Sequence, residues 1–300
     1  MNIINKAIVS ILPVFPKKIV RIFANKYIAG DKIEDAVKKV KELNSKGIMA
    51  TMDVLGEAIK NRDEAIKSKQ ESLEVLDVIE KHNLNSNLSV KLTMIGLNLD
   101  YDFCLSLITE IVEYANTKNN FVRIDMEDSS VTESTIKIFE TLWKKYDNVG
   151  IVLQAYMRRS EQDILRLNAI GANFRICKGI YIEQEEIAFK KKQEVRDNFL
   201  KIIKLALEKK SYTGIATHDD YLVEGSKKII KELGLKKEEF EFQMLLGVTE
   251  NLRDKILNDG YRIRVYVPFG ERWYQYSMRR FKENPNVVGA VMKSIFRINN

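Results

Sequence analysis

The sequence predicts a (β/α)8 barrel, because short apolar segments of strand length alternate with longer amphipathic segments through most of the chain. Strands that are separated by helices pair in parallel, since a parallel connection needs a crossover. Eight such units in about 250 residues favour a closed barrel. A doubly wound sheet stays the alternative, although the first expected strand is not followed by the Gly-x-Gly-x-x-Gly loop of dinucleotide-binding folds.

The expected elements follow from the spacing of apolar residues. Strands are predicted over 47–52, 88–92, 121–125, 149–154, 172–177, 214–217, 241–245 and 263–267. Helices are predicted over 62–82, 101–116, 161–170, 194–209, 221–233, 250–258, 273–281 and 287–296, with one more starting at 129 or 130. No linker rich in Pro, Gly or Ser interrupts the chain, so we expect one domain over 1–300, with a helical segment (1–45) packed on the barrel (46–300).

The charge balance gives little support to a nucleic-acid-binding protein. Lys and Arg number 49 against 42 Asp and Glu, a net charge of +7, but the two signs are interleaved, as over 183–192. No dense basic segment with aromatic residues is present. We therefore expect solvated helix faces and a site for an anionic ligand, and nucleic-acid binding stays the weaker alternative.

The cysteines and histidines argue against most metal sites. Cys104 and Cys177 do not form a CxxC pair, and His82 and His218 are the only histidines. A zinc cluster, a disulfide scaffold and a site of several histidines are therefore unsupported. We expect reduced cysteines, no bound metal and a cytoplasmic location.

The N-terminal segment resembles neither a signal peptide nor a membrane span. The apolar stretch Ala7–Phe15 is short and contains Pro13, and no cleavage site of small residues follows it. No stretch approaches the roughly 20 apolar residues of a span. An amphipathic helix is expected to pack on the barrel, or alternatively to lie on a membrane surface. Its basic residues are Lys17, Lys18, Arg21 and Lys26.

Polar residues collect at the predicted C-terminal ends of the strands, where barrel enzymes carry their chemistry. They are Asp53, Lys91, Asp125, Gln154, Lys178, Thr217, His218 and Tyr266. Residues from so many strands would converge on one barrel mouth. Taken singly, Asp125 could instead cap the helix that follows it, and His218 and Asp219 could likewise cap the helix after the sixth strand. We favour an ion pair between Lys91 and Asp125, because buried charges are rarely left unpaired.

An arginine pair follows the last predicted strand. Arg279 and Arg280 lie one helical turn after Tyr276, and Glu283 is close enough along the helix to pair with either. Two planar guanidinium groups beside a barrel mouth suit a small carboxylate. A solvated basic patch on a surface helix is the alternative.

Six segments in this order resemble the bacterial proline dehydrogenase family. They are residues 89–93, 123–129, 153–156, 175–181, 216–219 and 276–283, within a match from Met49 to Glu283. The resemblance implies oxidation of L-proline to 1-pyrroline-5-carboxylate by hydride transfer to N5 of FAD, with a quinone as electron acceptor. No aldehyde dehydrogenase domain accompanies the match, so a separate 1-pyrroline-5-carboxylate dehydrogenase would act downstream. A quinone partner also suits a peripheral position at the inner face of the membrane.

The resemblance also implies roles for residues around the substrate. Arg279 and Arg280 match the pair that clamps the proline carboxylate, and Glu283 matches the carboxylate that holds this pair. Lys91 matches a lysine that lies against the substrate, held by a partner that matches Asp125. The ring of proline would be walled by residues that match Tyr266, Tyr276 and Leu245.

Around the flavin, the resemblance implies that Arg175 is the arginine beside N5. It also implies that Arg175 and Asp125 are catalytic residues. The other matching flavin contacts are Met126, Gln154, Lys178, Gly179, Ile180, Thr217 and His218. Ile180 and Cys177 stand where other members have different small or apolar residues. A second enzyme class is a Schiff-base aldolase on the same barrel, with Lys91 or Lys178 as the nucleophile.

Overall fold

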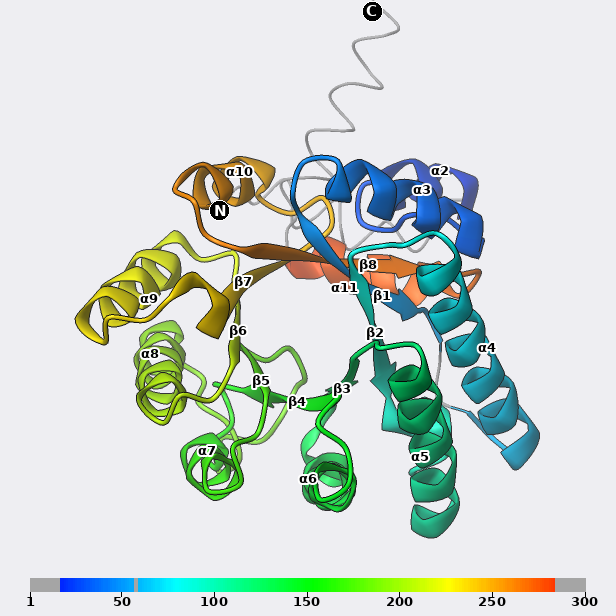
Figure 1. Ribbon diagram of the computed structural model, residues 1–300, viewed down its shortest axis with the longest axis horizontal. Coiled ribbons are helices and arrows are strands. Elements are labelled where there is room, and N and C mark those ends of the chain that lie inside the picture. The colour runs from blue at the N-terminus through cyan, green and yellow to red at the C-terminus, as the bar shows by residue number, and fades with distance from the viewer. Residues whose placement is uncertain (1–16, 57–58, 284–300) are drawn as a thin grey trace, which may run out of the picture.

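The computed structural model of the protein describes residues 17–56 and 59–283, with the backbone alone for residues 18, 19, 23 and 279–283. Eight parallel strands form a closed barrel in which each strand pairs with the next and β8 pairs with β1 (Figure 1). The predicted barrel is therefore confirmed, and the doubly wound sheet is excluded.

The strands coincide with the predicted apolar segments to within a few residues. They are β1 (Met49–Val54), β2 (Ser86–Lys91), β3 (Val122–Asp125), β4 (Val149–Gln154), β5 (Phe174–Cys177), β6 (Thr213–Ala216), β7 (Phe240–Leu245) and β8 (Ile263–Phe269). Their outward-facing side chains include Ile124, Ile151 and Ile176, which are fully buried against the surrounding helices. This apolar layer between barrel and helices is the core of the fold.

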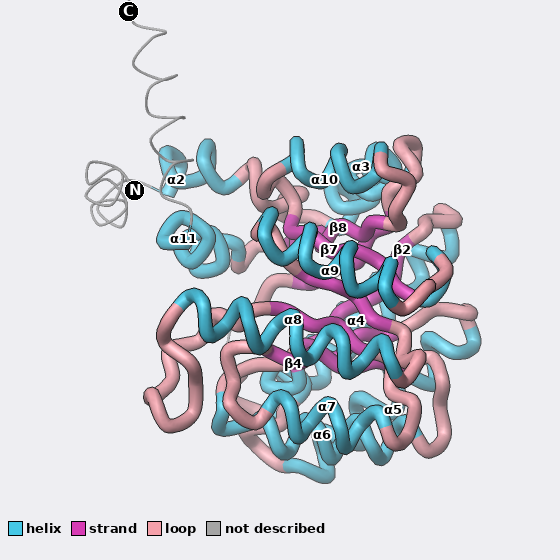
Figure 2. The backbone as a smooth tube through the Cα atoms, turned by 90° about the vertical axis from the view of Figure 1, so that its left-hand side faces the viewer, coloured by secondary structure: helices cyan, strands magenta, loops and turns pink. Residues whose placement is uncertain are grey.

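A ring of helices surrounds the barrel (Figure 1). It contains α4 (Arg62–Lys81), α5 (Tyr101–Thr117), α6 (Ser129–Trp143), α7 (Ser160–Asn168), α8 (Lys192–Glu208), α9 (Asp220–Glu232) and α10 (Glu250–Asn258), with short 3₁₀ turns at Leu92–Ile95 and Lys237–Glu239. Helix α11 (Trp273–Glu283) lies outside this ring, beyond the ends of the strands (Figure 2). The helix predicted over 287–296 lies outside the described residues.

Side-chain caps explain where several helices begin. Asn61 accepts a hydrogen bond from Glu64 N, and Asp100 accepts one from Phe103 N. The side chain of Asp128, not that of Asp125, caps α6, so the alternative reading of Asp125 as a helix cap is wrong. The side chain of Asp125 turns into the barrel instead.

Two N-terminal helices pack on this scaffold, as predicted. Helix α3 (Ile33–Asn44) packs on β1 and β8, and α2 (Lys17–Ala24) packs on α11 (Figure 2). The guanidinium of Arg21 lies 4.7 Å from the centroid of the Trp273 ring and pairs with Asp31. The assignment of residues 1–300 to a single domain stays a prediction. In the described part of the chain, no helix is long and apolar enough to cross a membrane.

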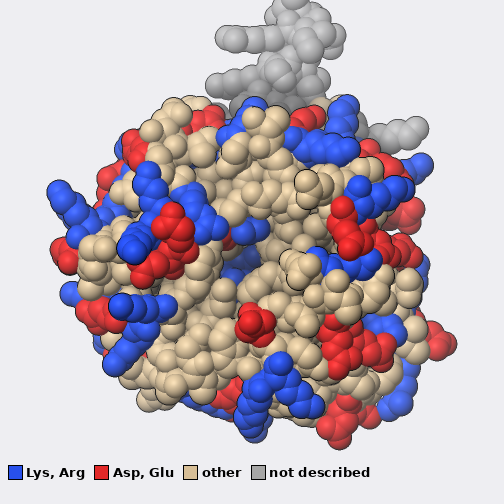
Figure 3. Space-filling model, viewed as in Figure 1, with Lys and Arg blue, Asp and Glu red and all other residues tan. Residues whose placement is uncertain are grey.

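On the face seen in Figure 3, acidic and basic side chains are interspersed around the rim, and Lys or Arg atoms lie in a hollow at the centre. The mixture of signs on this face agrees with the interleaved charges of the sequence and provides no basic surface there for nucleic acid. The barrel interior also contains buried arginines, among them Arg123 and Arg175.

Candidate active site

A cavity of about 750 Å³ opens at the C-terminal ends of the strands. It is lined by all thirteen predicted site residues whose side chains the structure describes. These are Lys91, Asp125, Met126, Gln154, Arg175, Lys178, Gly179, Ile180, Thr217, His218, Leu245, Tyr266 and Tyr276. The polar residues of the predicted strand ends therefore meet at one mouth, except Asp53, which does not line this cavity, and their roles stay predictions.

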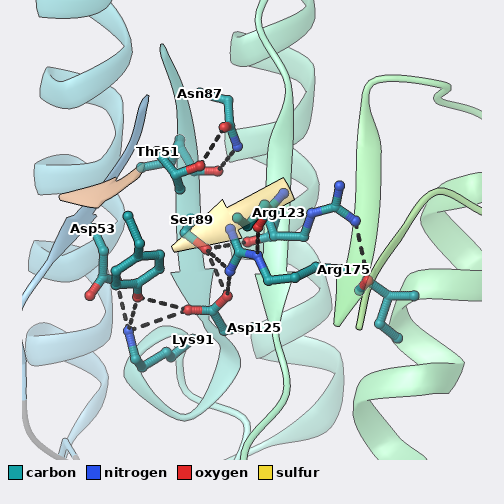
Figure 4. A network of polar contacts seen from close by, with 12 residues as sticks. Thr51, Asp53, Asn87, Ser89, Lys91, Arg123, Asp125 and Arg175 are labelled. Carbon is teal, nitrogen blue, oxygen red and sulfur yellow. Dashed lines mark hydrogen bonds and ion pairs between the residues drawn. The ribbon is translucent and has the colours of Figure 1, made fainter. Parts of the chain in front are cut away.

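Lys91, at the end of β2, is held by two carboxylates. Its Nζ lies 2.7 Å from Asp53 Oδ1 and 3.6 Å from Asp125 Oδ2 (Figure 4). Burial disfavours the ammonium, but the two carboxylates outweigh burial and raise the pKa of Lys91 above its usual value. Lys91 is therefore cationic at neutral pH, which argues against a role as an aldolase nucleophile.

Asp53 is the partner of Lys91 that the sequence analysis did not assign. It was singled out only as one of several polar residues at strand ends, whereas Asp125 was expected to hold the lysine. Asp53 is 2% exposed, at the end of β1 beside both β2 and β8. Burial raises the pKa of Asp53, and although Lys91 opposes this effect, the pKa stays above its usual value.

Asp125, at the end of β3, receives three hydrogen bonds. Its Oδ1 accepts from Arg175 Nη1 at 2.6 Å and from Ser89 Oγ at 2.8 Å, and its Oδ2 accepts from Tyr266 Oη at 2.9 Å (Figure 4). Burial would raise the pKa of this carboxyl, but Arg175 and then Lys91 outweigh burial and lower it. Asp125 is therefore ionised at neutral pH and links the two cations of the site.

Arg175 extends from β5 into the floor of the cavity and is 7% exposed. Its Nε donates to Gln243 Oε1 at 2.5 Å, and its guanidinium lies 5.3 Å from the centroid of the Tyr266 ring. The hydroxyl of Tyr266 stays protonated, because burial and then the carboxylates of Asp125 and Asp53 raise its pKa well above the usual value. The floor thus combines fixed cations with neutral donors.

The β4 and β5 side of the cavity carries other predicted flavin contacts. Gln154 Nε2 donates to the main-chain oxygen of Glu127 at 2.6 Å. Gly179 has φ 101°, and a Cβ there would lie 2.1 Å from the ring of Tyr156, so only glycine fits. Lys178 stands at the rim, where its Nζ is 3.6 Å from Asp219 Oδ2.

His218 connects the β6 side of the mouth to β7. Its Nε2 accepts from Leu245 N at 3.1 Å, and its Nδ1 is 3.2 Å from Thr249 Oγ1. Asp219 occupies the N-cap position of α9, but its side chain makes no capping hydrogen bond there. The carboxylate of Asp219 instead accepts two hydrogen bonds from Arg196, at 2.7 and 2.9 Å.

Helix α11 carries the last part of the predicted site. Tyr276 is 8% exposed and lines the cavity. Positions 279 and 280 follow one turn later on the same helix, but the side chains of Arg279, Arg280 and Glu283 lie outside the described residues. Among the described residues, no group of three or more His, Cys, Asp or Glu is arranged to hold a metal ion.

Comparison with known proteins identifies the family. A family model described as proline dehydrogenase matches residues 36–293. The chain belongs to the proline dehydrogenase family. Proline dehydrogenases of this family are flavin-dependent and oxidise proline to 1-pyrroline-5-carboxylate, so the predicted activity is confirmed and the aldolase and nucleic-acid alternatives are set aside.

Individual relatives agree with this assignment. Proline dehydrogenase 2 of Bacillus subtilis (strain 168) is 38% identical over 275 residues, which cover 92% of this chain and 91% of that protein. Proline dehydrogenase 1 of the same organism is 39% identical over 277 residues, 92% of each chain. Among solved structures, proline utilization A (PutA) from Bdellovibrio bacteriovorus, inactivated by N-propargylglycine, has a TM-score of 0.84 and 28% identity. The match covers 90% of this proline dehydrogenase but 33% of that longer chain.

Proposed function

We propose that the cavity binds FAD and L-proline together and that this enzyme oxidises L-proline by hydride transfer to the flavin, with a quinone as the final electron acceptor. The observation that carries the proposal is the meeting of Lys91, Asp125 and Arg175 in one buried network at the floor of a large cavity. Such a floor suits an anionic substrate beside a cofactor that accepts negative charge.

The cavity fits a flavin in size and in chemistry. Its volume of about 750 Å³ is in the upper part of the range for cofactor sites. The guanidinium of Arg175 supplies a fixed positive charge, and Met126 with Val152 supplies apolar wall. We assign FAD binding to Met126, Gln154, Arg175, Lys178, Gly179, Ile180, Thr217 and His218. Bound FAD supplies the hydride acceptor, whereas the protein supplies position and electrostatic field.

On the substrate side, we assign the proline carboxylate to Arg279 and Arg280, with Glu283 holding this pair. Lys91 would lie against the substrate, and Tyr266, Tyr276 and Leu245 would wall the proline ring. These contacts would hold the reacting C–H bond at the short range, about 3–3.5 Å, that a direct transfer requires.

The amine of proline must lose its proton before an imine can form. The cations Lys91 and Arg175 disfavour a further positive charge in the cavity and so favour the neutral amine. Lys91 cannot accept this proton, because Asp53 and Asp125 keep it an ammonium. We propose that water takes the proton.

The proposed surroundings of the enzyme follow from its chemistry. A quinone acceptor lies in the membrane, so we propose a cytoplasmic enzyme with peripheral contact at the inner face of the membrane. Helix α2, which is basic and carries the half-exposed Ile22, is a candidate for this contact. A separate 1-pyrroline-5-carboxylate dehydrogenase would consume the product.

The visible spectrum of the purified protein tests this proposal. Flavin bands at roughly 380 and 450 nm are expected, and anaerobic addition of L-proline should bleach the band near 450 nm. D-proline at the same concentration serves as the control and should leave the spectrum unchanged. A colourless protein that binds no added FAD, or a yellow protein that L-proline does not bleach, would refute the proposed function.

A further inference from the structure

A chain of buried polar side chains runs along the barrel interior below the cavity. It begins at Arg264 in β8, passes through Glu241 and Gln243 in β7, and ends at Arg175 in β5. Glu241, Gln243 and Arg175 are 1%, 6% and 7% exposed. Branched apolar side chains fill most barrels of this kind, so a row of buried charges leading to the cavity floor points to a function.

The amide of Gln243 has a single orientation that satisfies both of its neighbours. Its Nε2 donates to Glu241 Oε1 at 2.6 Å, and its Oε1 accepts from Arg175 Nε at 2.5 Å. An ionised carboxylate only accepts hydrogen bonds, and a guanidinium only donates them. Turning the amide over would set oxygen against oxygen on one side and donor against donor on the other, so Glu241 fixes which end of Gln243 meets Arg175.

Glu241 is itself held firmly. It accepts from Arg264 Nε at 2.6 Å and from Tyr212 Oη at 2.6 Å, and Arg264 is anchored on Ala50 O at 2.7 Å and on Asn87 Oδ1 at 2.9 Å. Burial by itself would raise the pKa of Glu241, but Arg264 and the hydrogen bonds outweigh burial and lower it to about 2. The Glu241 carboxylate is therefore ionised at neutral pH and always accepts hydrogen bonds at this end of the polar series.

The backbone of β6 leaves just enough room for the Gln243 amide. Gly214 pairs in register with Glu241, and a Cβ at Gly214 would lie 2.4 Å from Gln243 Nε2. A methyl group at position 214 would therefore displace the amide without changing its chemistry.

Gln243 and Asp125 hold the guanidinium of Arg175 from two sides. Gln243 binds Nε, and Asp125 binds Nη1 at 2.6 Å. We propose that Gln243, oriented by Glu241, is a positioning residue that aims the charge of Arg175 at the bound flavin. This inference rests on the proposed function, in which Arg175 lies beside the reactive edge of FAD.

The midpoint potential of the flavin in the purified holoenzyme tests the inference without a turnover assay. Gln243→Leu removes the hydrogen bond to Nε and adds no charge, so Arg175 should stabilise negative charge on the flavin less well. We expect a more negative potential and, because a charge-assisted hydrogen bond is worth roughly 1.5–3 kcal/mol, flavin reduction by proline slowed about tenfold or more. An unchanged potential in a folded Gln243→Leu protein would overturn the inference.

Two further variants separate positioning from simple electrostatics. Glu241→Gln removes a negative charge, which alone would make the potential more positive. The amide oxygen of the new side chain can replace Glu241 Oε1, which accepts from both Arg264 Nε and Gln243 Nε2, so the Gln243 amide should keep its orientation. Positioning therefore predicts no fall in the potential of Glu241→Gln, and a fall like that of Gln243→Leu would refute it. Gly214→Ala should also lower the potential, and it replaces Gln243→Leu if that variant does not fold.

Thr213→Val is the matched control. Thr213 is fully buried in β6 and donates to Ser211 O at 2.9 Å, and neither group belongs to the hydrogen-bonded series from Arg264 to Arg175. Its potential should equal that of the wild type, and a shift equal to that of Gln243→Leu would refute a specific role. Arg175→Ala separates the two proposals. If its potential shifts and that of Gln243→Leu does not, the positioning role alone is wrong; if neither shifts, the placement of Arg175 beside the flavin is wrong.

Discussion

The Nζ of Lys91 lies 2.7 Å from Asp53 Oδ1, although 38 residues separate them in the sequence. The pair joins the ends of β1 and β2, and Lys91 lines the cavity. Asp53 is nearer to the ammonium than Asp125, so it contributes the larger share of the field that keeps Lys91 charged. Lys91 is thus held mainly from β1 and secondarily from β3.

Asp53→Asn should impair proline oxidation only in part, because Asp125 still stabilises the ammonium of Lys91. Removing one partner of a buried ion pair costs about 3–5 kcal/mol, and the residual pairing with Asp125 should keep the loss at the lower end. We expect kcat/KM for proline to fall by about a hundredfold. Steady-state kinetics measures this effect, with the exposed carboxylate variant Asp77→Asn as the control. Kinetics equal to those of the control would show that Asp125 alone suffices for Lys91.

Arg279→Ala and Arg280→Ala should each raise the KM for proline sharply. Truncating one partner of a desolvated, charge-assisted pair costs about 2–5 kcal/mol, which corresponds to at least a thirtyfold weaker interaction. Lys282→Ala removes a positive charge from the same helix and should leave KM unchanged. If all three variants behave alike, the arginines form only a basic surface patch.

Arg175→Ala should weaken flavin retention or slow flavin reduction more than it alters proline binding. The reason is that its guanidinium occupies the cavity floor, whereas the substrate carboxylate is assigned to α11. Stopped-flow reduction at several proline concentrations separates the two effects. Wild-type reduction rates together with normal flavin content would count against the proposed position of Arg175.

Glu241 should make the stability of the enzyme depend on pH under acidic conditions. Its pKa is lowered in the folded protein to about 2, below the unfolded value, so its contribution is present above the unfolded pKa and is lost as the pH falls through the folded pKa. A shift of this size corresponds to about 3 kcal/mol, lost between roughly pH 4.5 and pH 2.

Urea unfolding at several pH values measures this contribution. In Glu241→Gln, the free energy of unfolding should be lower at pH 6 and should decline less between pH 4.5 and pH 3 than in the wild type. Parallel declines in the two proteins would mean that other carboxyl groups account for the acid sensitivity.

The fold could be predicted from the sequence because each strand is a short apolar segment bounded by an amphipathic helix. Ile124 and Ile151 face the helices, and buried apolar residues of this outward layer make the strands recognisable in the sequence. The interior was harder to predict. Glu241 and Gln243 alternate with Phe242 and Met244, a period-two pattern that marks one polar face. In a barrel, that polar face could point to solvent or to the barrel axis. Only the structure of the closed sheet shows that it points to the axis.

The site was predictable in its membership but not in its internal pairing. Residues at strand ends must meet at one mouth, so Lys91, Asp125 and Arg175 could be grouped beforehand. Which carboxylate lies nearest to Lys91 depends on strand register and side-chain direction, and the sequence pattern fixes neither. The assignment of Lys91 to Asp125 alone therefore missed Asp53. The roles of Arg279 and Arg280 stay predictions.

The barrel axis of this enzyme is occupied by interlocked donors and acceptors, and this limits how its sequence can drift. Replacing Glu241 alone leaves the Arg264 guanidinium buried without its counter-charge. Replacing Arg264 alone likewise leaves the Glu241 carboxylate buried without its counter-charge. Homologues that differ at one of these two positions should therefore differ at the other as well, whereas the apolar layer outside the barrel can change one residue at a time.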